Sequence, residues 1–162
     1  MCASFGARVV ATGTGIVLNN AVATFASVGE NQAVAGRRTI SSMAPTLVRA
    51  GPELRAILGT PGGDTIPSTL AQLVQHLVDE GEPLDRAIEA PRWHHGFFPD
   101  EARYEPSLAS ESALLADLRA RGHALRSLGH RVGDANCIVL AGARAFAYAD
   151  SREPGVAIAA GR

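Results

Sequence analysis

The apolar pattern of the chain changes its period after the glycine-rich stretch Gly59-Thr60-Pro61-Gly62-Gly63. Beyond this stretch, apolar residues recur at the helical spacing i, i+3, i+4, i+7 and i+8, at Leu70, Leu73, Val74, Leu77 and Val78. Pro67 suits the first turn of this helix and Gly81 suits its C-terminal stop. Before the stretch, two strands are predicted, joined by a turn at Ala50-Gly51-Pro52.

The remaining expected elements are also grouped by type along the chain, with helices next to helices and strands next to strands. Residues 83–90 form a short helix that ends at Pro91, and a leucine-spaced helix from Leu108 to Leu118 is closed by Gly122. Two further strands are expected at the end of the chain and one short strand near its start, at residues 136–140, 144–149 and 7–10, with a surface loop at 21–36. Strands and helices in blocks favour an α+β fold, with helices layered on largely antiparallel sheets.

Length and composition set limits on the class of protein. The 162 residues fit a single domain, 1–162, and 46% hydrophobic with 19% charged residues is ordinary for a globular protein. A net charge of −1 gives no reason to expect nucleic acid or a membrane surface as a partner. The N-terminus lacks the basic start and apolar run of a signal peptide. Cys2 and Cys137 suggest no disulfide framework, and we expect one exposed and one core thiol.

Several short motifs fail the tests for a cofactor or metal. Gly13-Thr14-Gly15 is no dinucleotide fingerprint, because Leu18 stands where the third glycine belongs, and no Lys-Ser/Thr follows Gly59-Thr60-Pro61-Gly62-Gly63 to make a phosphate loop. His94 and His95 are adjacent on an extended segment, so their side chains face opposite ways and make a poor chelating pair. We expect no metal and no cofactor.

Successive blocks of the chain, in order and over almost its whole length, resemble the small subunit of the γ-glutamyltranspeptidase (glutathione hydrolase) family. The blocks are Phe5-Gly6-Ala7-Arg8-Val9-Val10, Gly13-Thr14-Gly15-Ile16-Val17-Leu18-Asn19-Asn20, Arg38-Thr39-Ile40-Ser41-Ser42-Met43-Ala44-Pro45-Thr46, Gly59-Thr60-Pro61-Gly62-Gly63, Ala90-Pro91-Arg92-Trp93-His94-His95 and Ala149-Asp150-Ser151-Arg152. The resemblance implies the αββα sandwich of the N-terminal nucleophile hydrolases, here incomplete and lacking the first strands. It implies hydrolysis or acyl transfer on γ-glutamyl amides such as glutathione, by a threonine freed through self-cleavage.

Four residues match functional positions of that family. Gly62 and Gly63 match its oxyanion-hole glycines, and two amides without side chains at the mouth of a helix can approach a developing oxyanion closely. The alternative is a plain turn between strand and helix. Ser41 and Ser42 match the pair that holds the substrate α-carboxylate, with a solvated strand edge as the alternative.

Two departures from the family pattern put its activity in doubt for this chain. The nucleophilic threonine and its strand would lie upstream of Met1, and only a chain-terminal threonine has the free amine that the chemistry uses. Cys2 falls on a substrate-binding asparagine instead of the nucleophile. Ala21 and Thr24 replace the two side chains that bind the substrate ammonium, so we expect the parent enzyme not to prefer glutathione. The family's acylase and amidohydrolase branches are the expected relatives.

Two interpretations of function therefore stay open. A third, a nucleotide-binding module, is not supported, because the glycine-rich stretches do not match the known nucleotide-binding motifs. The chain is the C-terminal portion of a threonine amidohydrolase that takes a small-molecule amide, or a non-catalytic remnant that acts at most as an assembly or binding fragment. In either case a missing central strand would leave unpaired sheet edges. We expect the chain to need the upstream large-subunit segment or a partner chain, and to be prone to aggregation without it.

Overall fold

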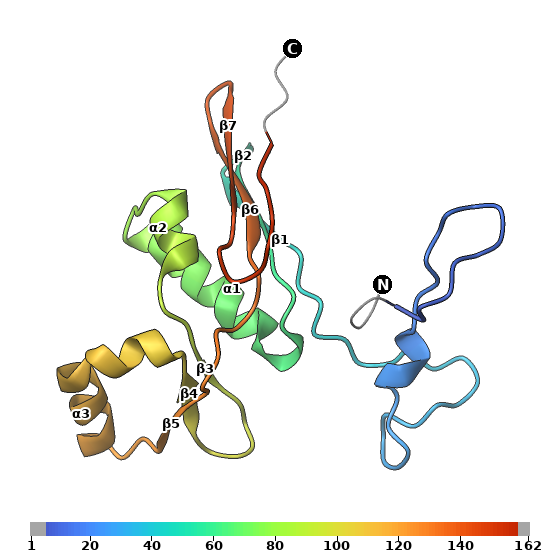
Figure 1. Cartoon of the computed structure of the whole chain (residues 1–162), viewed down its shortest axis with the longest axis horizontal. Helices are drawn as coiled ribbons and strands as arrows, with labels where there is room; N and C mark the ends of the chain where they lie inside the picture. Colours follow the sequence, from blue (N-terminus) through green and yellow to red (C-terminus); the bar gives the residue numbers. More distant parts are fainter. Residues whose placement is uncertain (1–5, 159–162) are drawn as a thin grey trace. The chain divides into compact units, whose positions relative to one another are not determined.

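The structure, a computed structural model, describes residues 6–158 and divides the chain between Ser42 and Met43 into two compact units. We call residues 6–42 the first unit and residues 43–158 the second unit, and describe each by itself (Figure 1). The single domain expected over residues 1–162 stays a prediction.

The first unit contains little regular structure. The Ala7 N–H donates to the Leu18 carbonyl at 2.9 Å, and a single bridge joins Val10 to Val17. The strand predicted at residues 7–10 is therefore reduced to that bridge, in a segment where Arg8 has a φ of 58° that no strand accommodates. The predicted loop at 21–36 contains a 3₁₀ helix, η1 (Ala21–Thr24).

The main sheet of the second unit has four antiparallel strands in the order β1-β2-β6-β7 (Figure 1). The strands are β1 (Thr46–Ala50), β2 (Glu53–Gly59), β6 (Asn136–Ala141) and β7 (Arg144–Ala149). Both predicted strand pairs are confirmed, and the pairing of β2 with β6 joins them into one sheet, with Ile57 opposite Ile138. Glycine-containing turns close each hairpin, at Gly51 and Gly142.

Helices pack on one face of this sheet. The 3₁₀ turn η2 (Gly63–Thr65) leads into α1 (Ile66–Val74), which continues as the π-helical turn η3 (Gln75–Asp79), and α2 (Leu84–Glu89) follows. The core joins both layers, and its buried side chains are Ala56, Leu58, Ile66, Leu70, Leu73, Ile88, Ala135 and Cys137. The helix predicted from the apolar stripe is confirmed, since Leu70 and Leu73 supply the centre of this core.

The opposite face of the sheet carries exposed apolar side chains. The strand register sets Leu47, Ile57 and Ile138 side by side across β1, β2 and β6, and they are 63%, 39% and 37% exposed. Alternation along β2 explains the difference between the faces, because Ala56 and Leu58 point to the helices and Ile57 points away from them.

A second, small sheet follows α2. Its strands are β3 (Trp93–His95), β4 (Ala102–Tyr104) and β5 (Leu125–Ser127), with β3 antiparallel and β5 parallel to β4. The 3₁₀ turn η4 (Pro106–Ser110) and α3 (Ser112–Ala120) connect β4 to β5. The sequence did not predict these three-residue strands, which are too short to show an alternating pattern. Leu108, predicted within the helix, lies in η4 instead, before α3 begins.

Candidate active site

The Gly59–Thr65 stretch presents two adjacent backbone N–H groups at the entry to α1. Gly62 and Gly63 have φ angles of 144° and 62°, which L side chains rarely adopt. The Thr65 N–H and hydroxyl both donate to the Gly62 carbonyl, at 3.2 and 3.0 Å, and fix the turn. Among residues 6–158, the turn and loop backbone hydrogen bonds include none donated by Gly62 or Gly63. Both N–H groups are thus placed to bind an anion at the start of a helix.

A second glycine packs against this loop. Gly133 has a φ of 75°, and a Cβ at that position would lie 2.7 Å from Thr60 Oγ1 and 3.0 Å from Arg92 Nη1. The Asp134 N–H donates to the same Thr60 hydroxyl at 3.1 Å. A Cβ at Gly62 would lie 3.8 Å from the Gly133 Cα. The segment around Gly133 therefore braces the loop through contacts that only glycine permits.

Beneath this segment lies a buried network of two arginines and two carboxylates. Arg92 Nη2 is 2.7 Å from Asp150 Oδ2, Arg152 Nη1 is 3.1 Å from Asp150 Oδ1, and Arg152 Nη2 is 2.7 Å from Glu105 Oε2. None of the four side chains is more than 3% exposed. Each buried charge has an opposite charge beside it, which offsets the cost of removing these groups from water.

The same network holds the bracing segment on both sides. Arg92 Nη1 donates to the Val132 carbonyl at 2.7 Å, and the Val132 N–H donates to Glu105 Oε1 at 2.7 Å. The Ala135 N–H donates to Asp150 Oδ2 at 2.8 Å. Residues 132–135 are thus bound at both ends to buried charges and hold the glycine loop in place.

The network also keeps its carboxylates ionised. Burial raises the pKa of Glu105, but hydrogen bonds from Arg152 and from the Val132 and Arg92 N–H groups outweigh burial, and the pKa lies below its ordinary value. Burial likewise opposes ionisation of Asp150, yet the Ala135 and Arg152 N–H groups and the Arg92 charge lower its pKa. The network is therefore a set of full charges.

Ser41 and Ser42 lie at the end of the first unit, in a segment without helix or strand. Ser41 is exposed and Ser42 is half-buried. Thr24 is bound nearby in the same unit, since its hydroxyl donates to the Ala21 carbonyl at 2.6 Å and lies 2.7 Å from the Thr39 hydroxyl. The two serines belong to the first unit and the two glycines to the second.

His94 and His95 face opposite sides of β3, as predicted. His94 is buried, with Nδ1 2.8 Å from the Ser68 hydroxyl, whereas His95 is exposed. The fold brings one carboxylate near each ring, at 3.9 Å for Asp64 and His94 and at 3.1 Å for Asp100 and His95. The two rings do not share a ligand site, and sequence spacing alone did not show these carboxylates.

A cavity in the second unit is separate from the glycine loop. It has a volume of about 490 Å³ and lies between the sheet and α2, with Leu77, Leu84, Val139, Phe146 and Tyr148 in its walls. Its walls are largely apolar, although Arg55, Glu82 and Asp85 also line it. The adjacent backbone donors that can bind an anion stand at the glycine loop instead. We therefore place the candidate site at the loop and not in the cavity.

Other expectations concern the cysteines and the membrane. Cys137 is buried as expected, and burial raises the pKa of its thiol. Cys2 lies outside the described residues. Each helix within residues 6–158 is too short or too polar to cross a bilayer.

The bracing residues were not identified as a site from the sequence. Arg92, Asp150 and Arg152 stood in blocks that resembled a known family, but their contacts join positions 58 and 47 residues apart. No local periodicity predicts such a pairing. The one indication of these residues in the sequence was that charged residues stand next to predicted strands and helices whose patterns are otherwise apolar.

Comparison with known sequences gives one consistent result. The family model described as Gamma-glutamyltranspeptidase matches residues 2–160. A glutathione hydrolase proenzyme from Pseudomonas aeruginosa is 30% identical over 95% of this chain, and one from Escherichia coli is 33% identical over 76% of it. The chain spans 30% and 23% of the lengths of these two relatives.

Solved structures show the same similarity. The γ-glutamyltranspeptidase from Pseudomonas nitroreducens complexed with L-DON is 30% identical with a TM-score of 0.81, covering 97% of this chain and 88% of that one. The T380A mutant of the Helicobacter pylori γ-glutamyltranspeptidase is 27% identical with a TM-score of 0.78, covering 93% and 89%. The expected α+β fold of the N-terminal nucleophile hydrolase type is confirmed by these neighbours.

Proposed function

The chain belongs to the γ-glutamyltranspeptidase family, and on this basis we propose that it forms the C-terminal portion of an amidohydrolase or acyltransferase acting on γ-glutamyl or related amides. One observation carries the proposal: two successive glycine N–H groups stand at a helix entry, in a loop braced by buried charges. Such donors stabilise the oxyanion that forms when an amide carbonyl is attacked.

Gly62 and Gly63 would form the oxyanion hole. Preorganised donors are effective because they do not have to move as negative charge develops on the carbonyl oxygen. The brace supports this role, since Gly133 packs against Thr60 and Arg92 anchors the Val132 carbonyl. A loop fixed in this way costs little reorganisation during the reaction.

Ser41 and Ser42 would hold the carboxylate of the substrate by hydroxyl and backbone hydrogen bonds. Ala21 and Thr24 supply no carboxylate for an ammonium group, and the Thr24 hydroxyl is already bonded within the first unit. A substrate that carries the carboxylate but lacks the α-amino group suits these residues best, because an ammonium without an acidic partner is poorly held.

The nucleophile would be an N-terminal threonine supplied by sequence beyond this chain. The chain spans less than a third of the relatives, whose names describe them as proenzymes. The exposed row of Leu47, Ile57 and Ile138 supports a missing partner layer, since a sheet face of this kind packs against a second layer in stable domains. We propose that the large-subunit segment covers it.

The first test is the intact mass and N-terminal sequence of the protein purified from its own source. A chain that begins at an upstream threonine supports the enzyme. A chain that begins at Met1 or Cys2 would lack the usual nucleophile, and the non-catalytic alternative, an assembly or binding fragment, would stand in its place.

The second test compares two anilides that differ in one group. Glutaryl-4-nitroanilide is γ-glutamyl-4-nitroanilide without the α-amino group, so the pair isolates the ammonium. We expect the full-length protein to cleave the glutaryl compound with the higher kcat/KM. A preference for the γ-glutamyl compound of about tenfold or more, equivalent to about 1.4 kcal/mol, would contradict the assignment of Ala21 and Thr24.

A further inference from the structure

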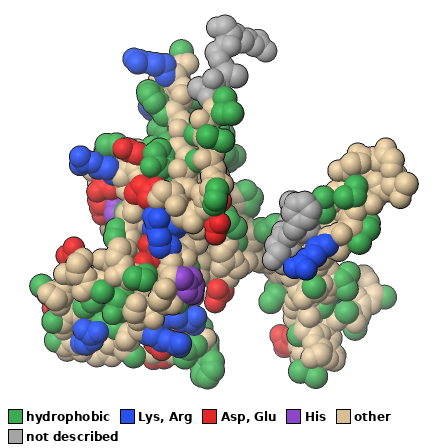
Figure 2. Space-filling view, in the orientation of Figure 1, with side chains coloured by type: hydrophobic (Ala, Val, Ile, Leu, Met, Phe, Trp, Pro, Cys, Tyr) green, Lys and Arg blue, Asp and Glu red, His purple; other side chains and the backbone are tan. Residues whose placement is uncertain are grey.

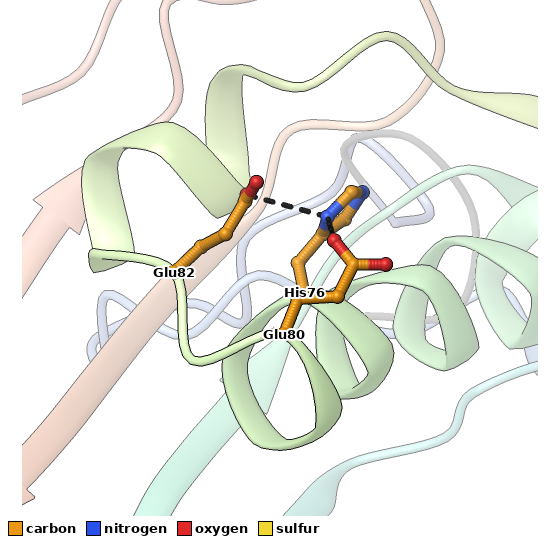
Figure 3. Close-up of side chains that lie close together, drawn as sticks. All are labelled: His76, Glu80 and Glu82. Atoms are coloured by element: carbon orange, nitrogen blue, oxygen red, sulfur yellow. Dashed lines mark hydrogen bonds and ion pairs between the residues drawn. The ribbon is translucent and has the colours of Figure 1, made fainter.

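Three metal-binding side chains converge at the C-terminal end of the helix that begins at the glycine loop. His76 Nδ1 lies 2.8 Å from Glu80 Oε2 and 3.3 Å from Glu82 Oε2. One donor atom from each residue lies within 4.8 Å of the others. Figure 3 shows the imidazole between the two carboxylates.

The local backbone brings the three residues together. His76 and Glu80 are four residues apart and therefore share one face of the helix. Gly81, with a φ of 67°, then reverses the chain, and the Glu82 N–H donates to the His76 carbonyl at 2.9 Å. This reversal carries the Glu82 carboxylate back over the helix end. A side chain at position 81 would strain that turn.

A fourth residue orients one of the carboxylates. Gln75 Nε2 donates to Glu80 Oε1 at 2.8 Å. This bond fixes the carboxylate so that its other oxygen, Oε2, points at His76. Hydrogen-bonded support of a ligand is the usual second layer of a protein metal site.

We propose that His76, Glu80 and Glu82 form a binding site for a divalent transition-metal ion of the zinc type. Zinc lies about 2.0–2.2 Å from imidazole nitrogen and carboxylate oxygen, so neighbouring donors in a tetrahedral site are about 3.4 Å apart. The 2.8 and 3.3 Å separations require only small side-chain movements to reach that spacing.

Charge and access also favour a cation at this point. Two carboxylates and a neutral imidazole match the charge of a divalent ion, and the C-terminal end of a helix favours positive charge. The three side chains are 24%, 40% and 35% exposed, so an ion can enter and water can complete its coordination. The imidazole favours a transition metal over Mg²⁺ or Ca²⁺, which prefer oxygen ligands.

A bound ion would fix the end of η3 to the segment that begins α2. Glu80 follows η3 directly, and Glu82 lies two residues before Leu84, where α2 begins. The ion would therefore join two helices of the core layer. This role is structural and does not depend on the proposed function.

Isothermal titration of the metal-stripped full-length protein with ZnCl₂ tests the proposal. We expect one Zn²⁺ per chain, with affinity at least tenfold weaker in His76→Ala and unchanged in the control His95→Ala. His95 is the matched control because it is an exposed histidine beside one carboxylate, Asp100. Equal affinity in His76→Ala and the parent chain, or no binding by the parent chain, would overturn the site.

A second variant guards against misfolding of the first. Glu82→Gln keeps the size of the side chain and removes one ligand charge, and circular dichroism checks that it is folded. We expect Co²⁺ to give visible absorption bands of a low-symmetry nitrogen and oxygen site in the parent chain and to lose them in this variant. Bands that persist unchanged in Glu82→Gln would assign the ion to other residues.

Discussion

The two units of the chain differ in how far they bury their side chains. The second unit buries both apolar residues and full charges, with Leu73 1% exposed and Glu105 0% exposed. In the first unit, apolar side chains such as Val22, Val28 and Ile40 are 75%, 75% and 70% exposed. Figure 2 shows hydrophobic side chains at the surface of the first unit.

This difference separates the two parts of the candidate site. The glycine loop is fixed by contacts within its own unit. Ser41 and Ser42 stand in a unit that buries little apolar surface of its own. Under the proposed function, we expect the loop to be preorganised and the serines to reach their final position when another segment covers the first unit.

The largest effect is expected from breaking the buried network. Glu105→Gln removes one of the two carboxylates that pair with Arg152 and leaves only Asp150. Removing one partner of a buried ion pair costs about 3–5 kcal/mol. Chemical denaturation, followed by the fluorescence of Trp93, measures the loss in free energy of unfolding. Arg121→Gln is the control, because the Arg121–Asp117 pair is 68% and 55% exposed and should contribute about 0.5 kcal/mol or less. Equal losses in both variants would show that the network is not a source of stability.

Acid should weaken the second unit through the same carboxylates. The pKa values of Glu105 and Asp150 lie below 4.5 and 3.8, their ordinary values. A carboxylate with a lowered folded-state pKa contributes stability that is full above its unfolded pKa and is lost as pH falls through the folded pKa. We expect Tm to fall steadily below about pH 4.5, and to fall less steeply in Glu105→Gln. Parallel curves for the two proteins would contradict this.

A smaller effect is expected from filling the space at the brace. Gly133→Ala combines left-handed backbone strain of about 1–2 kcal/mol with a clash of about 1–3 kcal/mol, since its Cβ would lie 2.7 Å from Thr60 Oγ1. Gly142→Ala is the control. Gly142 has a φ of 61°, and a Cβ at that position would have no atom within 4 Å. Gly142→Ala should therefore introduce the backbone strain without a clash. The difference in free energy of unfolding between the two variants isolates the contact, and no difference would mean that Gly133 does not brace the loop.

The parts of the fold that leave a local pattern could be predicted from the sequence. The stripe through Leu70 and Leu73 has helical period, and the turns at Gly51 and Gly142 mark the hairpins. Each pattern arises because one face of an element is buried and the chain must reverse between elements. The prediction therefore succeeded wherever burial and periodicity coincide along the chain.

Features that depend on contacts between distant residues could not be predicted from the sequence. The Arg92–Asp150 pair and the packing of Gly133 on Thr60 join segments that are distant in the sequence and adjacent in the fold. The short strands β3 to β5 carry too few residues for a period. The i,i+4 spacing of His76 and Glu80 is visible in the sequence. Glu82 comes close to them only because the chain reverses at Gly81, which the sequence spacing does not show.

The smallest effect is expected from a substitution in the first unit. It tests directly whether the two units differ in how far their side chains are buried. Val22→Ser changes a side chain that is 75% exposed, so the free energy of unfolding of the isolated chain should change by about 0.5 kcal/mol or less. Leu73→Ala, at a site 1% exposed, should cost about 2–5 kcal/mol. Repeating Val22→Ser in the full-length protein, by thermal denaturation, tests whether another segment covers the first unit there. A loss of more than about 1 kcal/mol in free energy of unfolding that occurs only in the full-length protein would support covering by another segment. A loss of that size in the isolated chain would contradict the exposure of Val22.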